Sequence, residues 1–179
     1  MIAAADIRDA LRTWLETALS ITVIYADRAS PRPATPYATL KLLSMRNIGF
    51  DDHGTLTDPG APALGTQSYK GDRVLTASIN VFGNASSDPW DLIRTAMNAL
   101  NAETARSQLA TAGLFPRRVT ALDDLTGLMD TEWEPRAHFD HEFALADEYT
   151  DEMGLIEHVE AEGTFESPNM THAETYTIN

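Results

Sequence analysis

The segment "DTEWEPRAHFDHEFAL", residues 130–145, alternates apolar and charged residues with a period of two. Its odd positions are mostly apolar, with His141 as the exception: Trp133, Pro135, Ala137, Phe139, Phe143 and Leu145. Its even positions from 132 to 142 are all polar or charged: Glu132, Glu134, Arg136, His138, Asp140 and Glu142. This period predicts a strand with one buried and one wet face. Pro135 lacks a backbone donor, which predicts a sheet edge or a bulge at that point.

Several other segments supply helices and strands around this one. Apolar residues recur at helical spacing from Ile7 to Leu19, which predicts an amphipathic N-terminal helix. A second helix is expected over residues 89–100, with Asp88 as its N-cap and Pro89 in its first position. A short third helix is expected to end near Gly113. Strands are predicted over 21–27, 37–45, 73–83 and 117–124.

The predicted fold class is α+β, a mixed, mostly antiparallel sheet with an N-terminal helix and one or two further helices packed on it. The segment 154–165 is the expected antiparallel partner of the strand at 130–145. Residues Gly49–Gly71 contain five glycines and two prolines with little periodicity, which predicts a long loop. We expect one domain over residues 1–166 and a polar C-terminal tail over 167–179.

Charge is distributed unevenly along the chain. The net charge is −14, yet the residues up to Thr120 are close to neutral, and from Ala121 onward Arg136 is the only basic residue among many acids. Binding of nucleic acid by phosphate neutralisation is therefore unfavourable for the second half. The acids alternate with apolar residues, which predicts a folded acidic face rather than disorder. The candidate members of this face are Glu132, Glu134, Asp140, Glu142, Glu157, Glu160 and Glu162.

The composition also limits the classes of protein that fit. There is no cysteine, which excludes disulfides, thiolate metal sites and cysteine nucleophiles. No apolar run is long enough to span a bilayer as a helix, so no membrane partner is expected. The tryptophans and one phenylalanine fall on the apolar sides of the predicted elements, where they would anchor the core or a subunit interface: Trp14, Trp90, Trp133 and Phe139.

An enzymatic site would have to use the polar row of the strand at 130–145. His138 lies two residues from Asp140, so both would share one face and could form an acid–base pair. Carboxylates on an open wet face, however, have ordinary pKa values and nothing to exclude water. The sequence contains no phosphate-binding glycine loop, nucleophile elbow or zinc-protease helix motif. We therefore expect no catalytic residues and no cofactor.

A metal site would have to use the acidic residues of the long glycine-rich segment. Its oxygen and nitrogen ligands would be Asp51, Asp52, His53 and Asp58. Their spacing does not match that of a calcium-binding loop. We therefore expect no metal ion.

Five blocks of sequence resemble the neck or tail terminator proteins of long-tailed bacteriophages, over roughly Ile7 to Gly163. These blocks are "IRDALRTWL" at 7–15, "VIYADRASPRPATPYATLKLLS" at 23–44, "TASINVFGNAS" at 76–86, "LDDLTGLMDTEWEPRAHFDHEF" at 122–143, and the strand beginning "GLIEHVE" at 154–160. The order and spacing of the blocks carry the resemblance, because no single motif is diagnostic.

The resemblance implies a non-enzymatic virion protein without a cofactor. Such proteins assemble as a hexameric ring that ends tail-tube polymerisation. The implied partners are other copies of the chain, the tail tube protein and a head-side connector or stopper protein, while genomic DNA passes through without specific binding. The implied location is the neck of the virion, and the host cytoplasm during assembly. Two alternatives remain: a head-completion, stopper or adaptor protein of the same neck, and a non-viral monomeric binding domain.

The acidic face has two interpretations within such a ring. Part of it would line the lumen and repel DNA, an effect that extends about 8 Å at physiological salt. Alternatively, it would dock on a basic patch of another component. The segment Gly49–Gly71 is expected to contact a neighbouring subunit or the tail tube.

Overall fold

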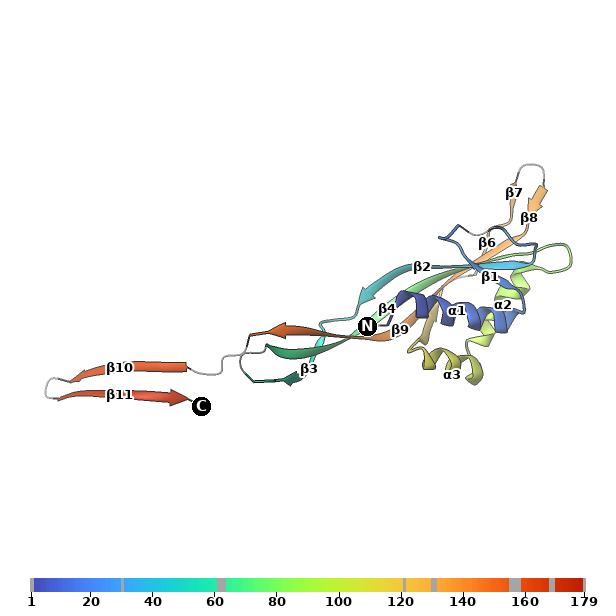
Figure 1. Ribbon diagram of the computed structural model, residues 1–179. Coiled ribbons are helices and arrows are strands. Elements are labelled where there is room, and N and C mark those ends of the chain that lie inside the picture. The colour runs from blue at the N-terminus through green and yellow to red at the C-terminus, as the bar shows by residue number, and fades with distance from the viewer. Residues whose placement is uncertain are drawn as a thin grey trace. The chain divides into compact units, whose positions relative to one another are not determined.

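The computed structural model describes residues 2–29, 31–60, 64–120, 122–129, 132–154, 159–167 and 170–178 (Figure 1). Its helices are α1 (Ala4–Leu19), α2 (Pro89–Ala99) and α3 (Glu103–Thr111). Its strands are β1 (Thr22–Tyr25), β2 (Tyr37–Asn47), β3 (Asp52–Thr57), β4 (Gly65–Phe82), β5 (Phe115–Val119), β6 (Asp123–Asp124), β7 (Gly127–Met129), β8 (Glu132–Glu134), β9 (Arg136–Met153), β10 (Val159–Ser167) and β11 (Met170–Ile178). The predicted α+β class is confirmed.

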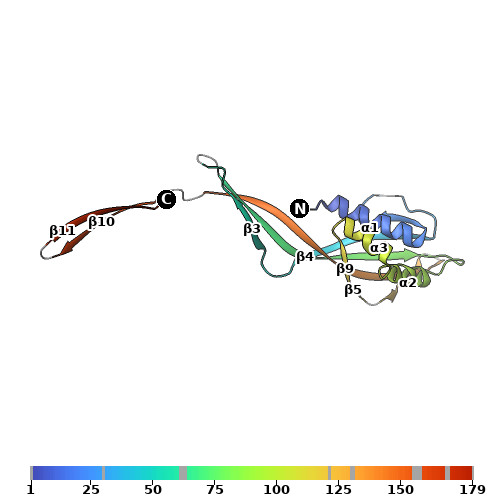
Figure 2. The same ribbon diagram turned by 90° about the horizontal axis from the view of Figure 1, so that it is seen from below.

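The chain divides into two compact units. Unit 1 comprises Met1–Asp51 and Lys70–Glu148, and unit 2 comprises Asp52–Tyr69 and Tyr149–Asn179. In unit 1 the strands of the main sheet follow the order β1-β2-β4-β9-β5. β1 runs parallel to β2, whereas the β2–β4 and β5–β9 pairs are antiparallel. The three helices lie on one face of this sheet (Figure 1, Figure 2).

The helices form where the sequence predicts them, for identifiable local reasons. The side chain of Asp88 caps α2 by accepting a hydrogen bond of 2.9 Å from the backbone N–H of Trp90, and Pro89 occupies the first turn. Gly113 follows α3 with a φ of 72°, a conformation that glycine adopts without a steric penalty. The apolar face of α1 is buried through its residues Ile7, Leu11, Trp14, Leu15 and Leu19.

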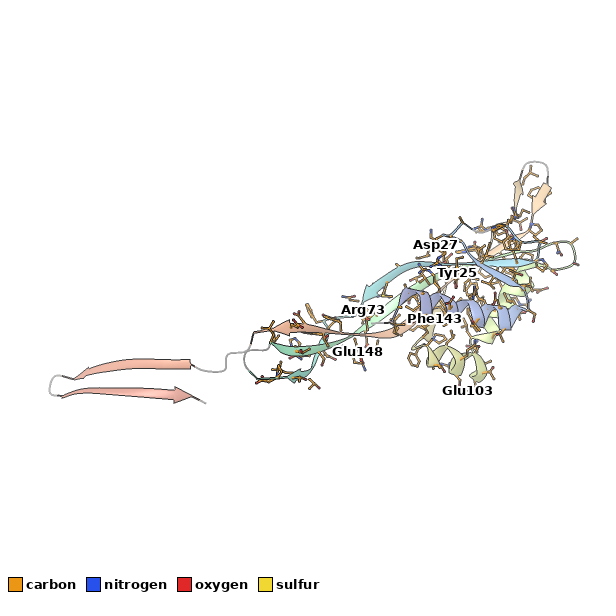
Figure 3. The ribbon with its side chains drawn as sticks, in the orientation of Figure 1. Tyr25, Asp27, Arg73, Glu103, Phe143 and Glu148 are labelled. Atoms are coloured by element: carbon orange, nitrogen blue, oxygen red, sulfur yellow. The ribbon has the colours of Figure 1, made fainter. Side chains whose placement is uncertain are left out.

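The core lies between this helical layer and the sheet. The odd positions of β9 face it, and Phe139 and Phe143 are completely buried. Phe143 lies between β9 and α1 in Figure 3 and meets Trp14 edge to face, with ring centroids 6.4 Å apart. Burying an aromatic side chain of this size contributes about 2–3 kcal/mol. The alternation predicted from residues 137–145 is therefore confirmed.

The prediction of one continuous strand through Pro135 is wrong. β9 begins at Arg136, and the preceding residues turn away as β8, which pairs with β7. Because proline has no N–H, it cannot continue the ladder, and its carbonyl instead accepts a hydrogen bond of 2.9 Å from Gly83 N. β9 is also an internal strand of the sheet rather than an edge.

The predicted long loop over Gly49–Gly71 is also wrong, because most of it is a hairpin formed by β3 and the start of β4. The side chains of Gln67 and Ser68 donate hydrogen bonds to the carbonyls of Gly54 and Thr55 across it, each at 3.1 Å. A Cβ atom at Gly54 would overlap the Ser68 hydroxyl. The glycine at this position leaves room for the Ser68 hydroxyl, whereas the sequence alone suggested flexibility.

The predicted pairing of 154–165 with the strand at 130–145 is not observed. β10 pairs in antiparallel register with β11, from Val159 opposite Ile178 to Ser167 opposite Met170. β9 instead has β4 on one side and β5 and β6 on the other. Most of the segment expected as a polar tail is therefore a strand. In the described residues, β10 and β11 form a sheet of their own.

Candidate functional site

The acidic row on β9 faces away from the helices, and an arginine or a histidine lies beside several carboxylates of this region. The His138 Nε2 atom lies 3.2 Å from Asp140 Oδ1. A guanidinium nitrogen of Arg46, on β2, lies 3.5 Å from a carboxylate oxygen of Glu142. The adjacent β8 residue Glu134 accepts a hydrogen bond from Arg32. Exposed pairs of this kind add at most about 1 kcal/mol of stability, but they cancel charge locally.

The other candidates for the acidic face lie elsewhere in the fold. Glu132 is the first residue of β8, and Glu160 and Glu162 lie on β10 opposite Thr177 and Thr175. Glu157 falls outside the described residues. The two predicted acidic rows therefore belong to strands that do not pair with each other. One continuous acidic face, as the sequence suggested, is not what the strand pairing provides.

The four aromatic anchors divide into two buried and two exposed residues. Trp14 and Phe139 are core residues, with exposed fractions of 1% and 0%. Trp90 is 39% exposed and Trp133 is 70% exposed, so neither anchors the core. Trp133 lies on β8 directly opposite Leu128 of β7, whose side chain is 58% exposed. Large exposed apolar side chains of this kind suit contact with another protein.

Two shallow hollows lie beside these exposed tryptophans. One, of about 340 Å³, is lined by Trp90, and the other, of about 600 Å³, is lined by Trp133. Asn84, Ala85 and Pro135 contribute to the walls of both. Their linings mix amide, carboxylate and apolar groups without a nucleophile placed beside a base. They suit packing against a partner surface better than catalysis.

A third pocket holds a residue that sequence reasoning passed over as an exception. His141 is 5% exposed on the core side of β9, and neither of its ring nitrogens has a hydrogen-bond partner among the described residues. Burial lowers the pKa of His141 to about 4, against a smaller raising effect of Glu142. The pocket, of about 250 Å³, is also lined by Arg106 and Arg117. The available signal was a histidine at an otherwise apolar position of the alternating row.

The described residues hold no cluster of three metal-binding side chains. Asp51, one of the loop residues considered as a ligand, instead binds Arg73 through both carboxylate oxygens, each at 2.7 Å. Among the helices of the described ranges, none has the length and hydropathy needed to cross a membrane.

Comparison with known protein families shows which family the chain belongs to. The sequence profile described as phage neck terminator protein matches residues 5–169. The chain belongs to this family. The match extends from α1 to the end of β10 and therefore includes both the sheet with its helices and part of unit 2. No curated protein matches the chain. The resemblance seen in the five sequence blocks is confirmed, and the protein is a structural component of the phage neck.

Proposed function

We propose that this neck terminator protein is a tail terminator that assembles as a hexameric ring. The ring ends polymerisation of the tail tube and joins the tail to the head-side connector while DNA passes through its centre. The observation that carries the proposal is the family match over residues 5–169. The same match favours a terminator over a head-completion or stopper protein. Its place would be the virion neck, with assembly in the host cytoplasm.

The exposed apolar side chains of unit 1 support self-assembly and contact with the tube. Trp133, Leu128 and Phe115 are each more than half exposed, and Trp90 is exposed beside a hollow. Aromatic residues of this type dominate the binding energy of protein interfaces when they become buried. We expect Trp90 and Trp133 to be buried in the assembled neck, either between subunits or against a partner.

The β3–β4 hairpin is proposed as a second contact with a neighbouring subunit or the tail tube. Every residue of β3 is exposed, and Phe50, just before the hairpin, is fully exposed. Tyr69 stacks on Tyr149 with ring centroids 5.1 Å apart and meets His53 edge to face. These contacts give the hairpin a defined shape in unit 2, so binding would require little ordering.

Passage of DNA is supported by charge rather than by a specific site. Each copy carries a net charge of −14, which opposes adhesion to a polyanion. The proposed lumen wall of Glu134, Asp140 and Glu142 has less support, because Arg32 and Arg46 offset the charge of Glu134 and Glu142. Docking on a basic surface is the better interpretation for the glutamates of β10.

Polymerisation of the tail tube protein provides the functional test. Purified tube protein would be assembled with and without equimolar full-length chain, and tube lengths and ends measured by electron microscopy. A terminator would shorten the tubes and leave a ring at one end of each. Unchanged tube lengths with no end-bound density would contradict the proposal. A matched variant, Trp133→Ala, tests whether an exposed tryptophan contributes, and weaker capping is expected.

A further inference from the structure

The pocket beside His141 combines a buried polar floor with a cationic opening. It lies between the α2–α3 turn, α3, β5 and β9, and is lined by Leu100, Asn101, Arg106, Arg117, Val119 and His141. Its volume of about 250 Å³ is below the range of about 300–1,000 Å³ typical of small-molecule pockets. A single polar side chain, rather than a large ligand, fits these dimensions.

The polar groups of this pocket lack partners within the described part of the chain. The side chain of His141 is only 5% exposed, and neither of its ring nitrogens forms a hydrogen bond within that part of the chain. A buried polar group left unsatisfied costs about 1–3 kcal/mol. Arg106 and Arg117 are exposed and form no ion pair with any described residue. The chain has 27 acidic and 13 basic residues, so most of its basic side chains could find an acidic partner. Two arginines without an ion pair at one pocket therefore favour an anionic occupant.

The two units differ in how their acidic residues are balanced by basic ones. All thirteen basic residues belong to unit 1. Unit 2 has no lysine or arginine, and its nine acids are Asp52, Asp58, Asp151, Glu152, Glu157, Glu160, Glu162, Glu166 and Glu174. Four of these glutamates lie on β10 and β11. An isolated two-stranded hairpin is marginally stable in water, so the β10–β11 pair gains from docking on a partner.

We propose that the His141 pocket binds a glutamate carboxylate from the β10–β11 hairpin of a second copy of this chain. Arg106 and Arg117 donate charge-assisted hydrogen bonds to the carboxylate. The ring nitrogens of His141 are covered in the free chain, so its neutral imidazole donates an N–H after the ring turns toward the bound carboxylate. The inference rests on the proposed ring, which brings copies of the chain into contact. It names the contact that would link one subunit to the next.

Nucleic acid is a poorer occupant than a carboxylate. Removing the nine acids of unit 2 from the total of −14 leaves unit 1 with a net charge of −5, which repels a polyanion. A single carboxylate depends mainly on the local guanidinium groups, because the more distant charges are screened over about 8 Å at physiological salt. The occupant is therefore a protein side chain delivered by a folded segment.

A binding assay with the full-length chain tests the pocket without requiring a ring. A synthetic peptide of residues 159–178 would be titrated into the isotope-labelled chain while the His141 ring signals are followed by NMR. We expect a saturable shift, with affinity reduced at least tenfold in Arg106→Glu/Arg117→Glu. Arg118→Glu is the matched control, because Arg118 is exposed, adjacent in β5 and absent from the pocket lining, so its affinity should stay unchanged.

Three results of this titration would overturn the assignment. The first is an absence of any shift in the His141 signals. The second is equal affinity in the wild-type chain and the double pocket variant. The third is an equal shift on adding inorganic phosphate at the same concentration, which would make the pocket a general anion site. Circular dichroism would verify that each variant is folded, as expected for substitutions of exposed arginines.

A charge-swap experiment tests whether the contact joins two copies. Full-length Arg106→Glu/Arg117→Glu and full-length Glu160→Arg/Glu162→Arg would be compared by sedimentation velocity, separately and mixed. Each variant alone should associate at least tenfold more weakly than the wild-type chain, and the mixture should recover association. Wild-type association by both variants would overturn the inference but leave the proposed ring intact. A wild-type chain that stays monomeric would contradict the ring and, with it, the contact between copies.

Discussion

Units 1 and 2 of this neck protein are built by different means. Among residues 2–154 with described side chains, every buried apolar side chain belongs to unit 1, where helices cover one face of the sheet. Unit 2 has strands and no helix in its described part, its strand β3 is exposed throughout, and it contains no lysine or arginine. Burial of apolar side chains stabilises unit 1, whereas β3 in unit 2 is held mainly by backbone pairing.

Core truncation should produce the largest difference between the units. Phe143→Ala removes a fully buried ring that packs on Trp14 and should lower the free energy of unfolding by about 3–5 kcal/mol. Leu56→Ala, on β3 with a side chain 49% exposed, should cost less than about 1 kcal/mol. Urea unfolding followed by tryptophan fluorescence and circular dichroism measures both. Equal costs would break the contrast between a packed and an unpacked unit.

Acid should weaken unit 1 through His141. Its pKa is lowered to about 4 in the folded state, so below pH 6.5 the unfolded chain binds the proton more tightly and stability falls until about pH 4. The full loss is about 3 kcal/mol, with no contribution above pH 6.5. His141→Leu should abolish this part of the pH dependence and raise stability at pH 7, because an unsatisfied buried group is removed.

Unfolding curves for the wild-type chain and His141→Leu between pH 4 and 7.5 would isolate this effect, since other groups titrate in both proteins. A constant stability difference across that range would show that His141 is not held neutral by burial. The same variant should bind the hairpin peptide more weakly. A gain in stability with a loss of binding would mark His141 as a residue retained for docking.

Two ion pairs on β4 and its neighbours should differ in strength because they differ in burial. Arg73 and Asp51 form two hydrogen bonds of 2.7 Å, and their side chains are 8% and 15% exposed. Asp51→Ala should cost about 2–3 kcal/mol, because it leaves a largely buried guanidinium without its carboxylate. Thermal unfolding would measure the loss, and a cost near zero would show that solvent replaces the carboxylate. Figure 3 labels Arg73 of this pair and Glu148 of the exposed pair that is compared with it.

The smallest effect is expected for the exposed pair of Lys70 and Glu148. Their charged atoms lie 3.0 Å apart, but the side chains are 61% and 66% exposed. Lys70→Ala should change the free energy of unfolding by less than about 1 kcal/mol, and added salt should reduce the difference further. A cost equal to that of Asp51→Ala would show that burial does not separate the two pairs.

Local features of unit 1 could be predicted because short-range rules determine them. The alternation from Ala137 to Leu145 defines the buried side of β9, and Asp88 with Pro89 defines the start of α2. The exposure of Trp133 could not be predicted in this way. Trp133 occupies an odd position, like the core residues of β9, and was therefore expected on the buried face. Pro135 interrupts the strand, however, and β8 pairs with β7 in a separate hairpin. Which apolar residues face solvent depends on such long-range topology.

Unit 2 was harder to predict because its strand β3 has no buried face. The β3–β4 hairpin contains Gly54 and Gly65, whose presence suggested a loop, although Gly54 permits close contact with Ser68. β10 pairs with β11 rather than with β9, whose residues 137–138 and 141–144 pair with β6 and β5. The candidate pocket at His141 was missed for a related reason, because its walls come from α3, β5 and β9 together.

Native mass spectrometry of the full-length chain over a concentration series would measure the size of the proposed ring. We expect a species with six times the monomer mass of 19.6 kDa, and annular particles in negative-stain images of the same samples. Adding the tail tube protein should increase the population of this species. A chain that stays monomeric at every concentration, and also in the presence of tube protein, would contradict the ring.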